Sequence, residues 1–307
     1  MPLPKLEDLL VLLPGGLVGI LLAMCGLVLV RAGTSHEYTR ARHAIGALLV
    51  FVAVPVAAIV TWYATHDGLP RFDGAATERA LIGCALVAVA VAAAAASRSP
   101  LLVRASLWIA FVGVVFLTLR TLIQRAPDDS GYVSPMLAAA IGIGVAAFTT
   151  LGELAVRRDG PAGGLFALSI SLGAAGQIAL LLGSAVLGQL AGTAAIVMAV
   201  VGTSCLVAPR KLPVAALVGA SAAGFLALIG VLAAFFGAEP LPLVVAIALP
   251  MAGCAGLLGR LPWLQGRAFL RFAVPISFAM LLAGAAVFVT ASSAAEKAKN
   301  DPYSDFR

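Results

Sequence analysis

Long apolar runs alternate with short polar segments along the whole chain, and the longest run, residues 160–209, contains no charged side chain. A single α-helix of these fifty residues would be about 75 Å long, whereas the hydrocarbon core of a bilayer is only ~30 Å thick. The run must therefore fold back on itself, and we expect one helical span on each side of a turn. The turn is predicted at its small and polar residues, which are Gly183, Ser184, Gly188, Gln189 and Gly192.

Eight further apolar stretches are each about as long as one membrane-crossing helix. Together with the two halves of the long run they predict ten spans, at residues 9–30, 44–64, 80–97, 103–124, 134–155, 164–186, 189–208, 213–236, 241–259 and 269–291. The predicted fold class is all-α, a polytopic helical bundle in a membrane. Residues 1–291 form one transmembrane domain and residues 292–307 a short solvated C-terminal tail. Whether residues 160–209 form two full spans or include a re-entrant segment stays open at this point.

The composition agrees with this pattern, because 62% of the residues are hydrophobic and only 11% are charged. Soluble domains carry roughly 25% charged residues. No stretch is left over for a soluble domain, since the predicted loops are short. Residues 1–8 are short and acidic and lead into a full-length span, so we expect the first helix to be retained rather than cleaved as a signal peptide.

Lysine and arginine are concentrated in every second loop, and short loops rich in these residues stay on the cytoplasmic side of a membrane. Twelve of the 20 basic residues follow the odd-numbered spans, and eleven of the 14 acidic residues lie on the opposite side. Both termini are therefore predicted outside, in a bacterial-type inner (cytoplasmic) membrane. The net charge of +6 reflects the cytoplasmic rim, so the expected partner is the lipid bilayer and not nucleic acid.

Reactive side chains are scarce. The three histidines, His36, His43 and His66, lie near loops, which argues against a haem held between two histidines within the membrane. Neither a Walker sequence nor a dinucleotide fingerprint occurs. The four cysteines fall singly in four spans and are interpreted as packing residues. We predict no catalytic residue, no cofactor and no metal site.

A few polar side chains inside the predicted spans could line a path through the membrane. The candidates are Gln177, Thr149, Thr150, Glu153 and Ser221. Gln177 is expected at mid-depth, where a primary amide needs a partner. The alternative for the neutral residues is a hydrogen bond between helices. For Glu153 the alternative is an ion pair at the rim with Arg157, four residues later. Arg120 is expected to extend outward from the opposite face.

Helix packing and helix distortion are predicted from small residues and prolines. Pairs of small residues four positions apart let helix backbones approach closely in a bilayer. They occur at Gly15 and Gly19, Ser169 and Gly173, and Gly188 and Gly192. Proline inside a span removes a backbone donor and kinks the helix, and it occurs at Pro14, Pro55, Pro250 and Pro275.

Several short segments can be compared, in their order along the chain, with the motifs of a known family. They are Ser35 to Arg40 (SHEYTR) with Gly46 after it, Ala110 to Gly113 (AFVG), Gly144 to Thr150 (GVAAFTT), and Leu212 to Val214 with Ser221 and Gly224. Over roughly residues 10 to 260 they resemble the membrane domain of the β subunit of proton-translocating NAD(P) transhydrogenase. The resemblance implies a helical membrane domain with an outward N-terminus and with nucleotide-binding subunits as partners.

The sequence departs from that family at the residues of its proton path. A histidine of the family falls on Ile109, an asparagine on Ala220 and a serine on Leu151. A path without these titrating and hydrogen-bonding groups should not carry protons by the family's mechanism. The family's β subunit also continues into an NADP-binding domain, whereas this chain adds a tenth span. Hydride transfer by this chain alone is therefore not expected.

Three functions remain open from the sequence. The first is a transhydrogenase-β-like inner-membrane protein that serves as a non-catalytic or repurposed subunit, with nucleotide-binding or other membrane subunits as partners. The second is a secondary transporter of a small apolar or weakly polar solute, because ten spans in about 300 residues suit such a carrier. The third is a structural scaffold subunit of a membrane complex.

Overall fold

A computed structural model of the chain describes residues 12–31, 38–66, 68–96, 100–127, 129, 131–156, 161–207, 213–236, 243–264 and 266–299. Within these ranges the chain forms ten α-helices and two 3-10 helices, one α-helix for each predicted span. They are α2 (Leu12–Arg31), α3 (Tyr38–His66), α4 (Ala76–Ala96), α5 (Pro100–Ile123), α6 (Pro135–Val156), α7 (Pro161–Leu181), α8 (Ala185–Val207), α9 (Pro213–Phe236), α10 (Leu243–Gly253), η1 (Cys254–Arg260), η2 (Pro262–Leu264) and α11 (Ala268–Lys299). The all-α prediction is confirmed for these residues.

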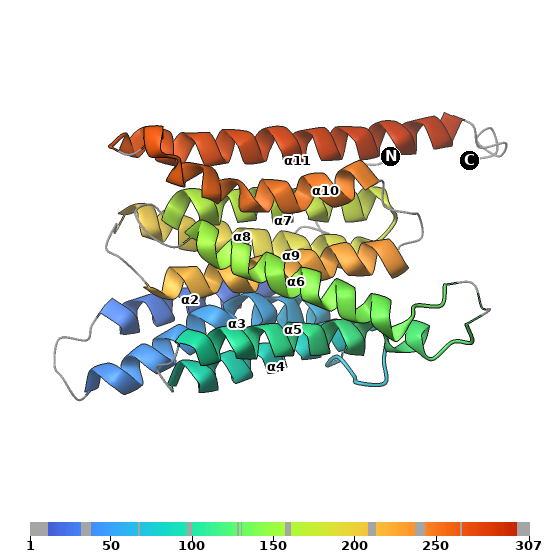
Figure 1. The fold of residues 1–307 in the computed structure, drawn as a ribbon, viewed down its shortest axis with the longest axis horizontal. Helices are drawn as coiled ribbons and strands as arrows, with labels where there is room; N and C mark the ends of the chain where they lie inside the picture. Colours follow the sequence, from blue (N-terminus) through green and yellow to red (C-terminus); the bar gives the residue numbers. More distant parts are fainter. Residues whose placement is uncertain are drawn as a thin grey trace.

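The helices lie side by side with their long axes roughly parallel (Figure 1). Helices that follow one another in the chain pair closely, as α2 does with α3, α4 with α5, and α7 with α8. The main contact between helices distant in the chain is that of α6 with α9. Helix α11 lies at one edge of the bundle, beside α7 and α10 (Figure 1).

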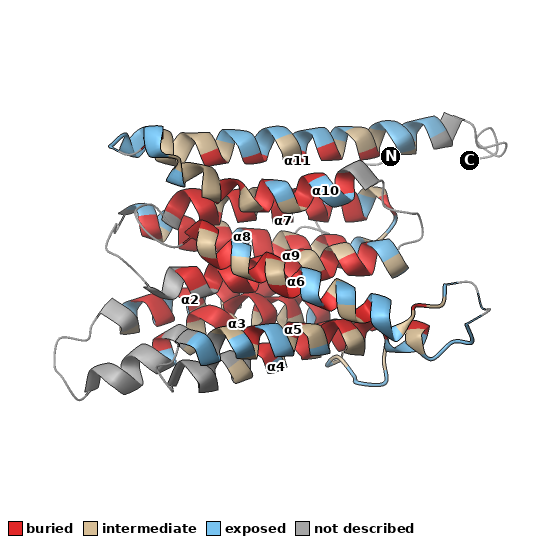
Figure 2. Ribbon diagram, in the orientation of Figure 1, coloured by how far each residue is buried: buried red, intermediate tan, exposed pale blue. Residues whose placement is uncertain are grey.

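Seven of the helices in the described ranges are long and apolar enough to cross a membrane. They are α3, α5, α6, α7, α8, α9 and α11; two shorter apolar segments cover Leu13–Leu29 and Val245–Arg260. The chain is thus a multi-pass membrane protein. Buried residues gather inside the bundle and exposed ones on its surface (Figure 2). Helix α9 is the most enclosed of the seven, with 72% of its apolar window buried, and α11 is the least, with 22%.

The long uncharged run forms two helices, each long and apolar enough to cross a membrane. Helix α7 ends at Leu181 and α8 begins at Ala185, so the turn is shorter than expected. Gly183 has a φ of +84°, a left-handed conformation that glycine adopts without strain. The backbone N–H of Leu187 donates to Ser184 Oγ, which caps the start of α8. Gly188, Gln189 and Gly192, which were predicted in the turn, belong to α8 instead.

Small residues bring helix backbones together at Gly19, which the spacing predicts, and at Gly26, which it does not. A methyl group on Gly26 of α2 would lie 2.6 Å from the carbonyl oxygen of Gly46 in α3. One on Gly19 would lie 2.7 Å from Ala57 Cβ in α3 and 2.6 Å from Val197 Cγ2 in α8. Such distances are too short for a side chain, so glycine is required at both positions.

The backbones of α6 and α9, two helices that are far apart in the chain, approach each other closely where the helices cross. A methyl group on Gly152 would lie 2.8 Å from the carbonyl oxygen of Gly219, and one on Gly219 would lie 2.8 Å from that of Gly152. Each helix therefore contacts the backbone of the other directly. We call this contact the glycine crossing.

Two helices continue for many residues past an internal proline, whereas α10 ends shortly after one. Pro55 and Pro275 lie within α3 and α11, which run on past them. Helix α10 ends at Gly253, three residues after Pro250, and the chain goes on as the 3-10 helix η1. A methyl group on Gly256 of η1 would lie 2.6 Å from Gly164 Cα. The ninth predicted span is thus a discontinuous helix packed tightly against α7.

Replacing Gly219 with leucine should destabilise the bundle, because the new side chain would overlap the backbone of α6. Overpacking of this kind costs about 1–3 kcal/mol. The measurement is thermal or SDS-induced unfolding of the purified protein in mixed micelles. Gly113→Leu on α5 is the control, since a methyl group there would meet no atom within 4 Å. Equal stability of the two variants would contradict the assigned crossing.

Candidate functional site

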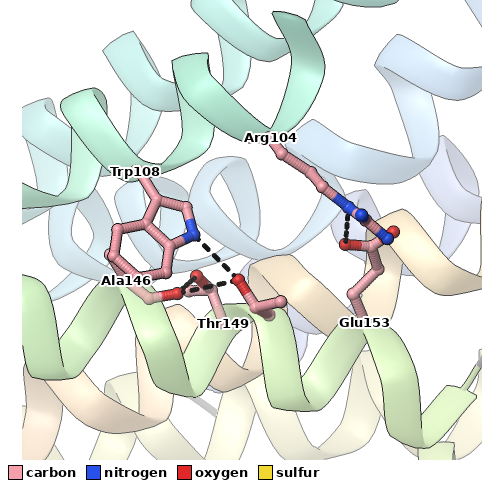
Figure 3. A network of polar contacts seen from close by, with 6 residues as sticks. Arg104, Trp108, Ala146, Thr149 and Glu153 are labelled. Carbon is pink, nitrogen blue, oxygen red and sulfur yellow. Dashed lines mark hydrogen bonds and ion pairs between the residues drawn. The ribbon is translucent and has the colours of Figure 1, made fainter. Parts of the chain in front are cut away.

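An ion pair within the bundle joins Arg104, near the start of α5, to Glu153, near the end of α6. Arg104 Nε lies 3.6 Å from Glu153 Oε2. Figure 3 shows the guanidinium reaching from α5 toward the carboxylate. The side chain of Glu153 is only 6% exposed, whereas that of Arg104 is 43% exposed. The Arg104 side chain is therefore partly exposed at the surface of the bundle, whereas the Glu153 side chain is buried inside it.

A tryptophan and two threonines lie one to two turns further along the same two helices. The indole N–H of Trp108 donates to Thr150 Oγ1 at 2.9 Å (Figure 3). The hydroxyls of Thr149 and Thr150 donate to the carbonyl oxygen of Ala146, at 2.6 and 3.2 Å. Threonine commonly satisfies its hydroxyl in this way within an apolar helix. Thr150 and Glu153 thus link α6 to α5, whereas the Thr149 hydroxyl bonds only within α6.

A second arginine contacts the end of α6. The exposed Arg260 of η1 donates through Nη2 to the carbonyl oxygen of Leu154, the residue after Glu153. The last carbonyls of a helix carry partial negative charge, so two guanidinium groups are stabilised there. The partner predicted for Glu153, Arg157, lies outside the described residues; the ion pair seen within them joins two helices. Arg120 is exposed near the opposite end of α5.

The remaining two candidates lie elsewhere. Ser221 is buried in α9 and donates to the carbonyl oxygen of Phe51 in α3 at 3.3 Å. Gln177 is exposed on α7, and because α7 ends at Leu181, it lies about one turn from the helix end rather than at mid-depth. The three residues of α6 therefore share one region, while Ser221 belongs to a separate helix contact and Gln177 faces outward.

Residues from three of the short segments that carry the sequence resemblance meet at one place. A methyl group on Gly224 of α9 would lie 2.5 Å from Phe111 Cε1 and 2.7 Å from Thr149 Cγ2. Ile109, Leu151 and Ala220 do not converge in this way. Ile109 is 75% exposed and Leu151 is 40% exposed, whereas Ala220 is fully buried. Phe111, Thr149 and Gly224 thus form a packing contact.

A cavity of about 490 Å³ lies between α6, α7, α9 and α10. Every lining side chain is apolar, and Phe148, Ile178, Phe235 and Pro250 are among the lining residues. Two glycines of the lining confirm the open space: a methyl group on Gly144 or on Gly230 would meet no atom within 4 Å. The volume falls within the range of about 300–1,000 Å³ that is typical of small-molecule sites. We call this space the apolar cavity.

The apolar cavity opens on the outside of the bundle. Its lining residues Gly144, Leu151, Ala234 and Ala246 are exposed. In a membrane, this surface faces hydrocarbon. Apolar cavities stay dry and take up apolar molecules, and an engineered one of about 150 Å³ already binds benzene. The sequence did not reveal this cavity, because a glycine beside open space and a glycine packed against another helix are the same letter in a sequence.

Arg79 is a second feature that the sequence analysis missed. It lies in the first turn of α4, is only 4% exposed, and anchors α4 to α5. Its guanidinium donates to four oxygens, which are the carbonyls of Gly74, Leu117 and Thr118, at 2.6, 3.0 and 3.4 Å, and Thr121 Oγ1, at 3.2 Å. A charged residue at the start of an apolar span was the only available signal.

Other chemistry-bearing residues give no further site in the described part of the chain. No group of three or more His, Cys, Asp or Glu residues there could hold a metal ion. The ring of His66 stacks on Trp62 with 3.8 Å between ring centroids, so this histidine takes part in packing at a helix end. No protein-family model and no curated protein matches the chain. Functional interpretation therefore starts from the polar residues of α5 and α6 and from the apolar cavity.

Substituting Arg79 with methionine should lower the free energy of unfolding by roughly 2–4 kcal/mol, since hydrogen bonds from a charged donor are each worth more than neutral ones. The free energy of unfolding of Arg79→Lys should lie between those of wild type and Arg79→Met, because an ammonium group cannot reproduce the forked geometry of a guanidinium. Unfolding in mixed micelles measures the effect. Arg120→Met, at the same end of the bundle but exposed, serves as the control and should change little.

Proposed function

We propose that all ten helices cross the bilayer of a bacterial-type inner membrane and that both termini lie outside. The ends of α5 and α6 that carry Arg104, Glu153 and Arg260 would then face the cytoplasm. An even number of crossings supports termini on one side, and the arginine-rich loops support the orientation.

Within that arrangement we propose that the chain is a secondary transporter of a small apolar or weakly polar solute, with the apolar cavity as its binding site. The observation that carries this proposal is a cavity of about 490 Å³ with a wholly apolar lining and an opening toward the lipid. A solute could enter it from the bilayer without crossing a polar surface.

The lining also argues for the class of solute. A charged molecule entering the cavity would lose its hydration and find no opposite charge, which is costly in a low-dielectric site. An apolar molecule would lose nothing comparable. The cavity therefore favours uncharged solutes.

The discontinuous helix α10 supports transport over static binding. Pro250 lines the cavity, and α10 changes to a 3-10 helix only three residues later. Transporters commonly build substrate sites beside such discontinuous helices, and the gating motions involve these segments. A small movement of α10 would alter the cavity wall directly.

Filling the cavity should abolish transport. A Cβ atom added at Gly230 would meet no atom within 4 Å, so a phenylalanine there would project from the cavity lining into the open space. In proteoliposomes, we expect wild type to show saturable, gradient-dependent flux of at least one solute from a panel of small uncharged compounds. Gly230→Phe should lower this flux at least tenfold.

The matched control is Gly284→Phe on α11. A methyl group at Gly284 also meets no atom within 4 Å, but this glycine does not line the cavity. The control should transport like wild type. Absence of gradient-dependent flux in wild type across the whole panel would overturn the transporter proposal.

A second candidate is a transhydrogenase-β-like subunit that has lost proton translocation. It is favoured by the contact among Phe111, Thr149 and Gly224, since residues of three similar segments pack together at one place. Ile109 and Leu151 lie at the exposed surface, which supports a non-catalytic role. Its partners would be nucleotide-binding or other membrane subunits.

Native purification tests this second candidate. We expect a stable complex with nucleotide-binding subunits on blue-native gels, without proton flux in vesicles. Glu153→Gln and Gln177→Leu should then leave NADP(H)-linked hydride transfer by the complex unchanged. Flux that either variant abolishes would instead show a rebuilt proton route, and a lone monomer would exclude the subunit role.

A further inference from the structure

A second hollow lies on the outer surface of α5, near the helix start. It has a volume of about 330 Å³ and is lined by Leu101, Arg104, Ala105 and Trp108. These residues are three, four and seven positions apart, so they share one face of the helix. Leu101 is 76% exposed and Trp108 is 37% exposed. We call this hollow the α5 groove.

We propose that the α5 groove binds the phosphate group of an anionic phospholipid, with Arg104 as the phosphate ligand. The proposal concerns a site on the lipid-facing surface and does not depend on transport through the apolar cavity. The leaflet is the one at the arginine-bearing ends of α5 and α6.

The charge of the groove supports this occupant. Glu153 is buried behind Arg104 and holds the guanidinium through Nε, while 43% of the arginine side chain remains exposed. A guanidinium has five N–H donors, and it binds phosphate oxygens in a forked geometry. Arg260 adds a second positive charge at the same end of α6. Among the described residues that meet at this end of α6, two arginines face one carboxylate, so their summed charge is positive.

The depth of the groove supports a lipid rather than a soluble anion. Tryptophan is enriched at the level of lipid headgroups, where its ring meets both polar and apolar groups. The indole of Trp108 is fixed there by its bond to Thr150. Exposed Leu101 and the exposed face of α6 offer apolar surface next to the guanidinium. Basic hollows between or beside transmembrane helices are known to bind acidic headgroups in this way.

Tryptophan fluorescence in nanodiscs tests the proposal. The full chain with Trp62→Phe and Trp263→Phe keeps Trp108 as its single tryptophan, because the sequence has three. Phosphatidylglycerol or phosphatidylcholine with brominated chains is added to otherwise unlabelled phosphatidylcholine, and the quenching of Trp108 is titrated. We expect about fivefold tighter association of phosphatidylglycerol, the effect of one arginine near the surface, and a smaller preference at high salt.

Arg104→Gln should reduce the ratio of phosphatidylglycerol to phosphatidylcholine association to about one. Arg104→Lys should keep most of the preference for phosphatidylglycerol. Arg120→Gln, an exposed arginine at the other end of α5, is the matched control and should keep all of it. The double variant Arg104→Gln with Glu153→Gln removes both charges of the pair, so the test still works if the single variant does not fold.

Equal quenching by the two lipids in wild type, or a preference that survives Arg104→Gln, would overturn the proposal. Equal losses in Arg104→Gln and Arg120→Gln would do so too, since they would show a general charge effect. Gly230→Phe should leave the lipid preference intact. A failure of the transport proposal is therefore separable from a failure of this one.

Discussion

The glycine crossing of α6 and α9 is the contact on which the arrangement of both sites depends. At Gly152 and Gly219 the two backbones touch, so no side chain separates the helices there. Toward the other end of the same helices, Gly144 and Gly230 have no neighbouring atom within 4 Å of an added methyl group. These glycines lie about 12 and 16 Å along their helices from the crossing. The helices are thus in contact at one end and separated at the other, and the apolar cavity occupies the separation.

Polar residues strengthen this arrangement because apolar side chains gain little by leaving hydrocarbon for the protein interior. Glu153 follows Gly152 directly, so the carboxylate that fixes Arg104 is placed by the crossing. Arg79 anchors α4 to α5 near the opposite end of α5. Helix α5 is therefore bound to its neighbours by one arginine near each end, and its outer face between them is free to contact lipid.

Much of the fold could be predicted from the sequence, since each apolar stretch of membrane-crossing length became one helix; residues 213–236 were predicted with the bounds that α9 has. The turn after α7 was placed too broadly, because glycines within a membrane helix look like turn residues. The candidate site was less accessible. Glu153 was singled out as an acidic residue within a span, but its partner Arg104 is 49 positions away, and only the pairing of α5 with α6 brings them together. Gln177 faces outward because of its rotational position on α7. The sequence of α7 has no clear polar face, so this position could not be predicted from it.

The lateral opening of the apolar cavity changes what binding to it would mean. A ligand that arrives through hydrocarbon is already dehydrated, so the hydrophobic effect contributes to its entry into the bilayer and hardly at all to its entry into the protein. The competing occupant is a lipid tail, which is equally apolar. Selectivity would therefore rest on shape, and apparent potency in water would follow the partition coefficient of each compound. Affinities would be comparable only when expressed as mole fractions in the membrane.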